Sequence, residues 1–204
     1  MKIICIGRNY ADHAAELKNE KPTEPVVFMK PDSALLSKKQ PFVIPEFSED
    51  VHHEVELLVR INRLGKHIQP KFAHKYYDQI GIGLDFTARD LQSELKEKGL
   101  PWEKAKSFDG AAVVSNQWLS VSDFENLNDI NFTLEKNNEI VQQGNSSQML
   151  WKIDEIISYV SQYFTLKIGD IIFTGTPKGV GQVKPDDKLI AKIENKELIN
   201  LNIK

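Results

Sequence analysis

The chain has 204 residues, 41% of them hydrophobic, which is enough to bury one substantial core, so we predict a single domain over residues 1–204. The formal net charge is -3 and both signs are well mixed, which argues against nucleic acid or a membrane as a partner. The one cysteine, Cys5, lies in an apolar run and excludes a disulfide framework. No apolar run reaches the roughly 18 residues that span a bilayer, and the N-terminus lacks the pattern of an export signal. A cytoplasmic protein is expected.

The first half of the chain is predicted to consist mainly of short apolar strands joined by turns. Strands are predicted at residues 2–7, 26–29, 52–61 and 80–86. A helix is expected to begin near Ala11, and a short helical stretch is expected at residues 72–77. Thr87 is predicted to cap a further helix that ends at Gly99, with Asp90 in the reciprocal position of a capping box.

The second half predicts a hairpin, a helix and further strands. Residues 130–143 have the pattern of two strands joined by a tight turn at Asn137-Asn138. Apolar residues over 149–164 follow helical spacing behind Ser146-Ser147 and predict a core-facing stripe. Extended runs are predicted at residues 170–174, 187–194 and 197–203. Helices and strands do not alternate regularly enough for a doubly wound sheet, so we predict an α+β or mixed-sheet roll.

Three carboxylates are the first candidate functional residues. Glu54 and Glu56 lie in an otherwise apolar predicted strand, where a period of two places both side chains on one face, and Asp85 ends another apolar strand. Neighbouring carboxylates repel one another unless a cation or solvent compensates them. An oxygen-only site of this kind suits Mg²⁺ or Mn²⁺. The alternative is an exposed edge strand, with Asp85 as a charge at the entry to a helix.

Other positions carry groups suited to proton transfer or to binding an anion. His13 and Glu16 are three residues apart on a predicted helix, so they face the same way and could activate water. Arg89 and Gln92 share a face at the start of a helix, where a carboxylate would meet a cation and favourable backbone dipoles. Lys106 is expected in a loop beyond that helix. All of these residues could equally belong to ordinary helix or loop surface.

The segment over residues 175–181 is rich in glycine and invites comparison with a phosphate-binding loop. It lacks the Gly-Lys-Ser/Thr ending of a Walker loop, and no dinucleotide fingerprint follows a strand, so we reject nucleotide binding. Its glycines would let the backbone approach a small ligand, with Thr176 offering a hydroxyl and an amide. A structural turn is the alternative.

Taken together, five segments resemble the catalytic domain of the fumarylacetoacetate hydrolase superfamily, in order and over nearly the whole chain. They are Asn9-Tyr10-Ala11-Asp12-His13, His52-His53-Glu54-Val55-Glu56, Asp85-Phe86-Thr87-Ala88-Arg89-Asp90, Lys104-Ala105-Lys106-Ser107-Phe108 and Gly175-Thr176-Pro177. The resemblance is greatest to the short, single-domain acylpyruvase and oxaloacetate decarboxylase type. It implies a mixed β-sandwich roll with a few flanking helices, within the α+β class, and a homodimer.

The resemblance also implies roles for individual residues. It implies that Mg²⁺, or Mn²⁺, is bound by Glu54, Glu56 and Asp85. It implies an acid/base pair, His13 and Glu16, with Lys106 as a third catalytic residue that supports the metal site. It implies that a small 2-oxo acid is held by Arg8, Arg89, Gln92 and Thr176. The sequence shows no departure from the family pattern at these positions.

We expect an enzyme that hydrolyses or decarboxylates a C–C bond of an acylpyruvate or of oxaloacetate, because His13 and Glu16 supply the pair that hydrolysis needs. A metal that chelates the 2-oxo acid would stabilise the enolate that forms. The first alternative is a dienol-dioate isomerase or an oxaloacetate tautomerase, which needs the same groups. The second is a protein that binds a metal or metabolite without catalysis.

Overall fold

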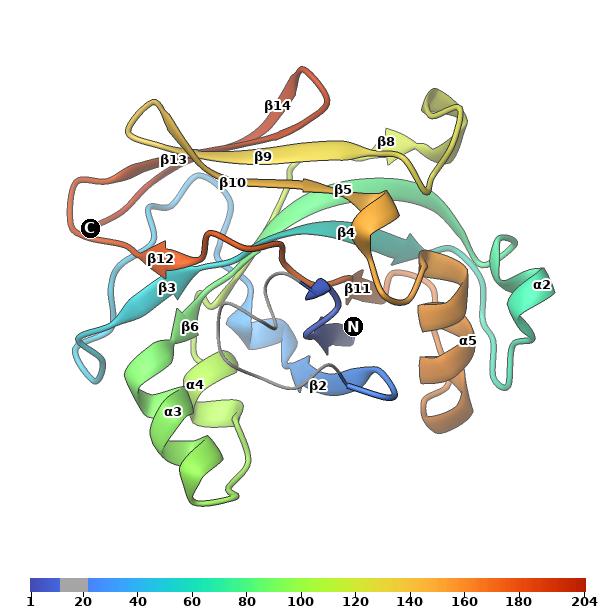
Figure 1. Ribbon diagram of the computed structural model, residues 1–204, viewed down its shortest axis with the longest axis horizontal. Helices are drawn as coiled ribbons and strands as arrows, with labels where there is room; N and C mark the ends of the chain where they lie inside the picture. The colour runs from blue at the N-terminus through green and yellow to red at the C-terminus, as the bar shows by residue number, and fades with distance from the viewer. Residues whose placement is uncertain (12–21) are drawn as a thin grey trace.

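The computed structural model describes residues 1–11 and 22–204, and in this part of the chain strands are far more extensive than helices (Figure 1). Seven of the described strands form the larger sheet. Their order is β2 (Val26–Lys30), β1 (Ile3–Gly7), β11 (Ile171–Phe173), β4 (Val55–Ile61), β5 (Tyr77–Asp85) and β7 (Ala112–Val114), with β8 (Leu119–Ser120) also paired to β5. The β1–β11 pair is parallel and the other pairs are antiparallel, so the sheet is mixed.

A second sheet lies across one face of the larger sheet, above β4 and β5 in Figure 1. It is antiparallel, in the order β10 (Glu139–Asn145), β9 (Asn131–Lys136), β13 (Lys188–Ile193) and β14 (Lys196–Asn202). A small third sheet joins β12 (Gly181–Gln182), β3 (Val51–His53) and β6 (Thr87–Ala88). This arrangement confirms the predicted α+β class and the mixed β-sandwich roll.

Short helices lie at the two ends of the sheets. In Figure 1, α3 (Arg89–Glu97) and α4 (Glu103–Lys106) lie at one end, and α2 (Pro70–Ala73) and α5 (Ile153–Tyr163) lie at the other. Single 3-10 turns are η1 (Asp32–Ala34), η2 (Val121–Asp123) and η3 (Ser146–Gln148). Among the described residues, no helix has the length and apolar character needed to cross a membrane.

The two faces of β4 have different neighbours. Leu57 and Val59 belong to the main core, which also contains Leu134 of β9, so this face packs against the second sheet. Leu58 points the other way and packs in a smaller cluster with Cys5 and Phe173, each fully buried. Because side chains alternate along a strand, Glu54 and Glu56 share the side of Leu58. The candidate carboxylates therefore face away from the second sheet.

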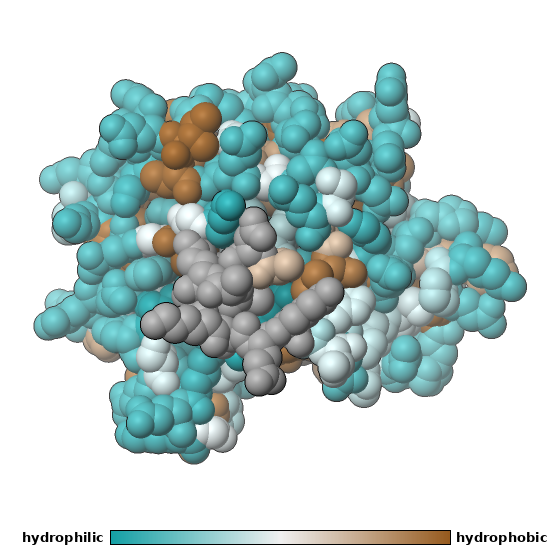
Figure 2. Space-filling view, in the orientation of Figure 1, coloured by the Kyte–Doolittle hydropathy of each residue, from teal (hydrophilic) through white to brown (hydrophobic). Residues whose placement is uncertain are grey.

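The surface in the view of Figure 2 is mainly hydrophilic, with separated hydrophobic patches. Large hydrophobic residues that remain exposed include Val43, Phe47, Leu64, Leu100, Ile140 and Ile168. They come from separate segments of the chain, as is usual for folded proteins.

Several predicted elements have different bounds in the structure. The predicted 52–61 strand is two strands, β3 and β4, because β3 pairs with β6 and β12 whereas β4 pairs with β5 and β11. The helical stretch predicted at residues 72–77 is wrong in extent, since α2 is a single turn at Pro70–Ala73 and β5 already begins at Tyr77. The helix predicted to begin near Ala11 extends onto residues outside the described ranges.

The predicted capping role of Thr87 is wrong. Residues 87 and 88 form β6, and the N-cap residue, Ala88, makes no side-chain cap. Asp90 instead accepts hydrogen bonds from the Ser48 hydroxyl at 2.7 Å and from the Glu49 amide at 3.0 Å. The predicted end of this helix at Gly99 is confirmed within two residues, and Gly99 has a φ of +63°.

The second half contains one confirmed turn and one displaced helix. Asn137 and Asn138 join β9 to β10 with φ values of +54° and +70°, which asparagine tolerates better than most residues. The predicted helix behind Ser146-Ser147 begins later, at Ile153. Residues 146–148 form a separate 3-10 turn capped by Asn145, whose side chain accepts the Ser147 amide at 2.7 Å.

We predict that Gly83→Ala destabilises the fold by about 1–3 kcal/mol, because overpacking a dense core costs that order. A Cβ at this position would lie 2.7 Å from the Val113 carbonyl oxygen and 2.9 Å from side-chain atoms of Leu58 and Phe173. Gly7→Ala is the control, since its Cβ would meet nothing closer than 3.7 Å. Urea unfolding measures both, and equal stabilities would contradict the prediction.

Candidate metal and substrate site

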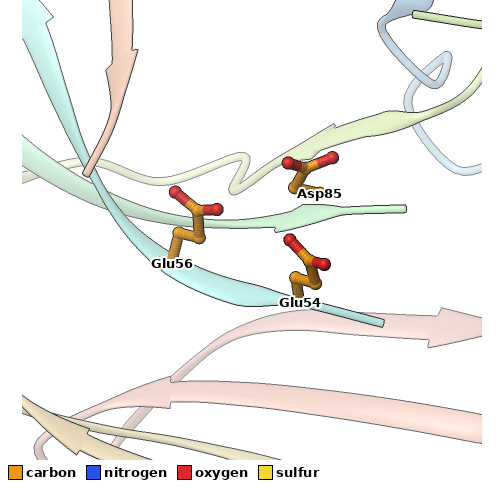
Figure 3. A group of neighbouring side chains, drawn as sticks. All are labelled: Glu54, Glu56 and Asp85. Atoms are coloured by element: carbon orange, nitrogen blue, oxygen red, sulfur yellow. The ribbon is translucent and has the colours of Figure 1, made fainter. Parts of the chain in front are cut away.

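The three predicted carboxylates converge at the paired ends of β4 and β5 (Figure 3). Glu56 pairs with Gly83, and the Asp85 amide donates to the Glu54 carbonyl at 2.8 Å, so the register brings the three acidic residues together. One oxygen atom from each carboxylate lies within 4.8 Å of the others, and all three residues are buried. The alternative of an exposed edge strand is therefore wrong.

The surroundings of Glu56 strongly disfavour the ionised form of its carboxyl group. Burial, followed by repulsion from Asp85 and Glu54, raises the pKa of the Glu56 carboxyl well above its usual range. The Gly175 amide donates to Glu56 Oε2 at 2.6 Å and acts in the opposite direction. Three close carboxylate oxygens fit a divalent cation such as Mg²⁺ or Mn²⁺.

Lys106 lies beside two of these carboxylates. Its Nζ donates to Glu54 Oε2 and Asp85 Oδ2, both at 2.8 Å, and to the Thr87 hydroxyl at 2.6 Å. Burial alone would lower the pKa of Lys106, but Asp85 and Glu54 outweigh it, so the pKa is raised and the ammonium stays charged. The predicted loop position is wrong, since Lys106 ends the one-turn helix α4.

Lys30 is a part of the site that the sequence reasoning missed. Its side chain is fully buried, and its Nζ lies 2.7 Å from Asp85 Oδ1 and also donates to the Lys106 carbonyl. Asp85 therefore has a lysine on each oxygen. The available signal was a lysine that directly follows the apolar run 26–29, at the position where the strand continues into the core.

The predicted substrate-binding residues meet at the same place. Arg89 donates to Gln92 Oε1 at 2.7 Å and to Glu54 Oε1, at the first turn of α3. Arg8 follows β1 with a φ of +57° and lines the same pocket. The predicted residues that line this pocket are Arg8, Glu54, Glu56, Asp85, Arg89, Gln92, Lys106 and Thr176. His13 and Glu16 lie outside the described residues.

Thr176 is held by a second residue that the sequence reasoning missed, Gln142 of β10. Gln142 Nε2 donates to the Thr176 hydroxyl at 2.9 Å, and its Oε1 accepts the Val55 amide at 3.0 Å. The same oxygen lies 3.0 Å from Nδ1 of His53, whose pKa burial lowers to about 4. Gln142 is buried and links the second sheet to the loop that carries Thr176. Its signal in the sequence was weak, because four of the seven residues of β10 are polar.

The fold and this acidic pocket define a class of protein. Residues 2–202 match the family described as fumarylacetoacetate (FAA) hydrolase C-terminal. The chain belongs to this family, as its motifs predicted.

Individual relatives have named activities. The chain is 42% identical to "Oxaloacetate tautomerase FAHD1, mitochondrial" of Bos taurus, over 94% of this chain and 86% of the relative. It is 39% identical to "Oxaloacetate tautomerase YcgM" of Escherichia coli K12, over 97% and 90%. The structure of fumarylpyruvate hydrolase from Pseudomonas aeruginosa in complex with Mn²⁺ and pyruvate superposes with a TM-score of 0.93, at 32% identity, over 100% and 89%. These relatives are enzymes.

We predict that Lys30→Met destabilises the protein by about 3–5 kcal/mol, the usual cost of removing one partner from a buried ion pair. The substitution leaves one oxygen of buried Asp85 without its cation. Lys104→Met is the matched control, because Lys104 is exposed. Chemical unfolding of both variants is the measurement. A loss below about 1 kcal/mol for Lys30→Met would show that its charge does not stabilise the fold.

Proposed function

We propose that the protein is a divalent-metal-dependent enzyme that acts on a small 2-oxo acid. The observation that carries this proposal is the convergence of Glu54, Glu56 and Asp85 in a pocket whose wall also holds Arg89 and Gln92. An acidic cluster alone could be a structural feature. An acidic cluster beside buried cations and an amide suits a metal together with an anionic substrate.

The roles of the ligand-binding residues follow from their positions. Glu54, Glu56 and Asp85 would hold Mg²⁺ or Mn²⁺, and the relative solved with Mn²⁺ and pyruvate supports Mn²⁺. A bound divalent cation supplies positive charge that stabilises an enolate of the substrate. Lys106 and Lys30 hold two of the carboxylates in place through ion pairs.

The substrate would lie against the cationic wall of the pocket. Arg89 at the first turn of α3 provides a charged donor for the substrate carboxylate, and Gln92 positions its guanidinium. Arg8 adds a second guanidinium, and Thr176 offers a hydroxyl and a backbone amide. These groups would hold the substrate in one orientation in the pocket.

The reaction we place first is the interconversion of keto and enol oxaloacetate. The curated relatives at 42% and 39% identity carry this name. A base removes a proton from C3 and the oxygen on C2 receives one, so no C–C bond breaks. His13 and Glu16 are proposed to move the proton, as the family resemblance implies. This order differs from the sequence-based expectation, which placed C–C cleavage first.

Hydrolysis of a C–C bond is the second candidate, because a solved relative is a fumarylpyruvate hydrolase. Glu16, oriented by His13, would take a proton from water, and the resulting hydroxide would attack the distal carbonyl of an acylpyruvate. The bond to the pyruvate portion then breaks, and its electron pair remains as the enolate. Decarboxylation of oxaloacetate would give the same enolate without water.

The domain and assembly predictions remain part of this proposal. A family match over residues 2–202 supports a single catalytic domain over residues 1–204. The homodimer implied by the resemblance is tested by sedimentation of the purified protein, which would give a mass of twice 23.3 kDa.

We predict that Mn²⁺ or Mg²⁺ raises the melting temperature of the protein, because binding to the folded state alone stabilises it. Glu56→Gln should abolish the increase, since it removes one of three converging carboxylates. Glu139→Gln at the exposed start of β10 is the matched control and should respond as wild type does. The same melting temperature with and without metal in the wild-type protein would count against the metal site.

We predict that wild-type protein with Mg²⁺ accelerates enol–keto conversion of oxaloacetate, and that Glu54→Gln lowers the rate at least about a hundredfold, since charge stabilisation of this kind contributes that order. The enol absorbance measures the first reaction, and product NMR with acetylpyruvate and oxaloacetate detects cleavage to pyruvate. Loss of acetylpyruvate hydrolysis in Glu16→Gln would support the hydrolase candidate. Unchanged substrates in the presence of bound metal would instead support a non-catalytic binding protein.

A further inference from the structure

Lys96 of α3 is a further lysine that lines the pocket. It lies four residues after Gln92, so both side chains are on one face of α3, and both line the pocket. A helix rises about 1.5 Å per residue, which separates the two positions by about 6 Å along the axis. Gln92 and Lys96 therefore line the pocket from successive turns of one helix.

Trp102 fixes the position of the Lys96 side chain. The Nζ atom lies 5.3 Å from the centroid of the indole ring, within the range of a cation–π contact. Trp102 is itself packed against Phe28, with ring centroids 6.0 Å apart, and both aromatic residues line the pocket. The indole thus orients the ammonium without neutralising it.

Two other cations near the carboxylates already have acidic partners. Lys106 pairs with Glu54 and Asp85, and Arg89 pairs with Glu54. Across residues 1–11 and 22–204, no carboxylate lies within ion-pair distance of Lys96. Lys96 is therefore a half-buried cation that forms no ion pair with the described residues.

The pocket as a whole has an excess of positive charge on this side. Burial, and then Arg8, Arg89 and Lys106, lower the pKa of Lys96 to about 8. Among the described residues that line the pocket, four cations outnumber three carboxylates, and a divalent ion would enlarge the excess. A ligand with two negative charges compensates this field better than a ligand with one.

We propose that Lys96 binds the second carboxylate of a dicarboxylic 2-oxo acid and so selects dicarboxylates over monocarboxylic 2-oxo acids of equal length. This inference rests on the proposed function, because the first carboxylate and the 2-oxo group must occupy the Arg89 and Gln92 side of the pocket. Lys96 then acts as a specificity-determining residue at the distal end.

Binding of two matched ligands tests the proposal. Oxaloacetate and 2-oxobutanoate share a four-carbon 2-oxo acid skeleton and differ in the distal carboxylate. Their dissociation constants are measured by fluorescence titration with Mn²⁺ present, for wild type, Lys96→Met, Lys96→Arg and the control Lys98→Met. Lys98 is on the same helix but is exposed and paired with Glu94 at 2.5 Å.

The wild-type protein should bind oxaloacetate about tenfold more tightly or better, the order expected for a charge-assisted hydrogen bond. Lys96→Met should remove this preference and leave 2-oxobutanoate binding unchanged. Lys96→Arg should retain most of the preference, and Lys98→Met should retain all of it.

Several results would overturn the proposal. Equal weakening of both ligands in Lys96→Met would mean that Lys96 acts through the general field of the pocket. A preference that survives Lys96→Met, or a wild-type protein with no preference, would also show that Lys96 does not select the substrate. Binding and conversion are measured separately. If the wild-type protein binds oxaloacetate but does not convert it, the result contradicts the proposed function and leaves the role of Lys96 in binding intact. A folded Lys96→Gln variant repeats the test if Lys96→Met unfolds.

Discussion

Repulsion among three buried carboxylates is the constraint on which the rest of the site depends. Their oxygen atoms lie within 4.8 Å of one another, and burial removes the water that would screen them. Lysine side chains reduce the repulsion at two of the three carboxylates. Lys30 and Lys106 flank Asp85, and Lys106 also contacts Glu54. Glu56 receives a backbone amide in place of a cation, and burial, followed by repulsion from the other two carboxylates, raises the pKa of Glu56. A cation bound beside Glu56 would therefore supply positive charge at the carboxylate that the lysines do not contact.

The sheet geometry holds these groups in place at low conformational cost. The register of β4 and β5 fixes Glu56 opposite Gly83, where the absence of a Cβ lets Leu58 and Phe173 pack closely against the strand. Gly175 has a φ of +103°, and a Cβ there would lie 2.7 Å from that of Asn9. Only glycine allows this close approach, which brings the Gly175 amide to Glu56. Rigid strands therefore position a site that loops complete.

The sequence predicted the parts of the structure that depend on local pattern and on family motifs. Apolar alternation located the strands, and the spacing of Glu54 and Glu56 correctly placed both on one face. Long-range pairing decided the rest. Thr87 has the composition of a helix cap, but pairing with β3 draws it into a strand and Lys106 engages its hydroxyl. No local rule predicts that pairing, because it joins segments 35 residues apart.

Lys30 and Gln142 were missed for the same reason. A lysine at the end of a strand and a glutamine in a polar strand usually face solvent. Each is buried here because an element distant in sequence supplies its partners: Asp85 of β5 for Lys30, and Thr176 for Gln142. Buried polar groups are retained when all their partners are present. The partners belong to the carboxylate site and to the loop beside it.

The distribution of charge connects the two ligands that the pocket is proposed to hold. Lysines that compensate Glu54 and Asp85 make the pocket less attractive to a divalent cation than three unpaired carboxylates would be. Arg8, Arg89 and Lys96 on the wall add to this effect. An anionic substrate would offset this repulsion of the metal, because its negative charge balances the positive charge of these side chains. Binding free energies are reciprocal, so a substrate that strengthens metal binding is itself bound more strongly when the metal is present. The buried lysines would therefore couple the binding of metal and substrate through their charge.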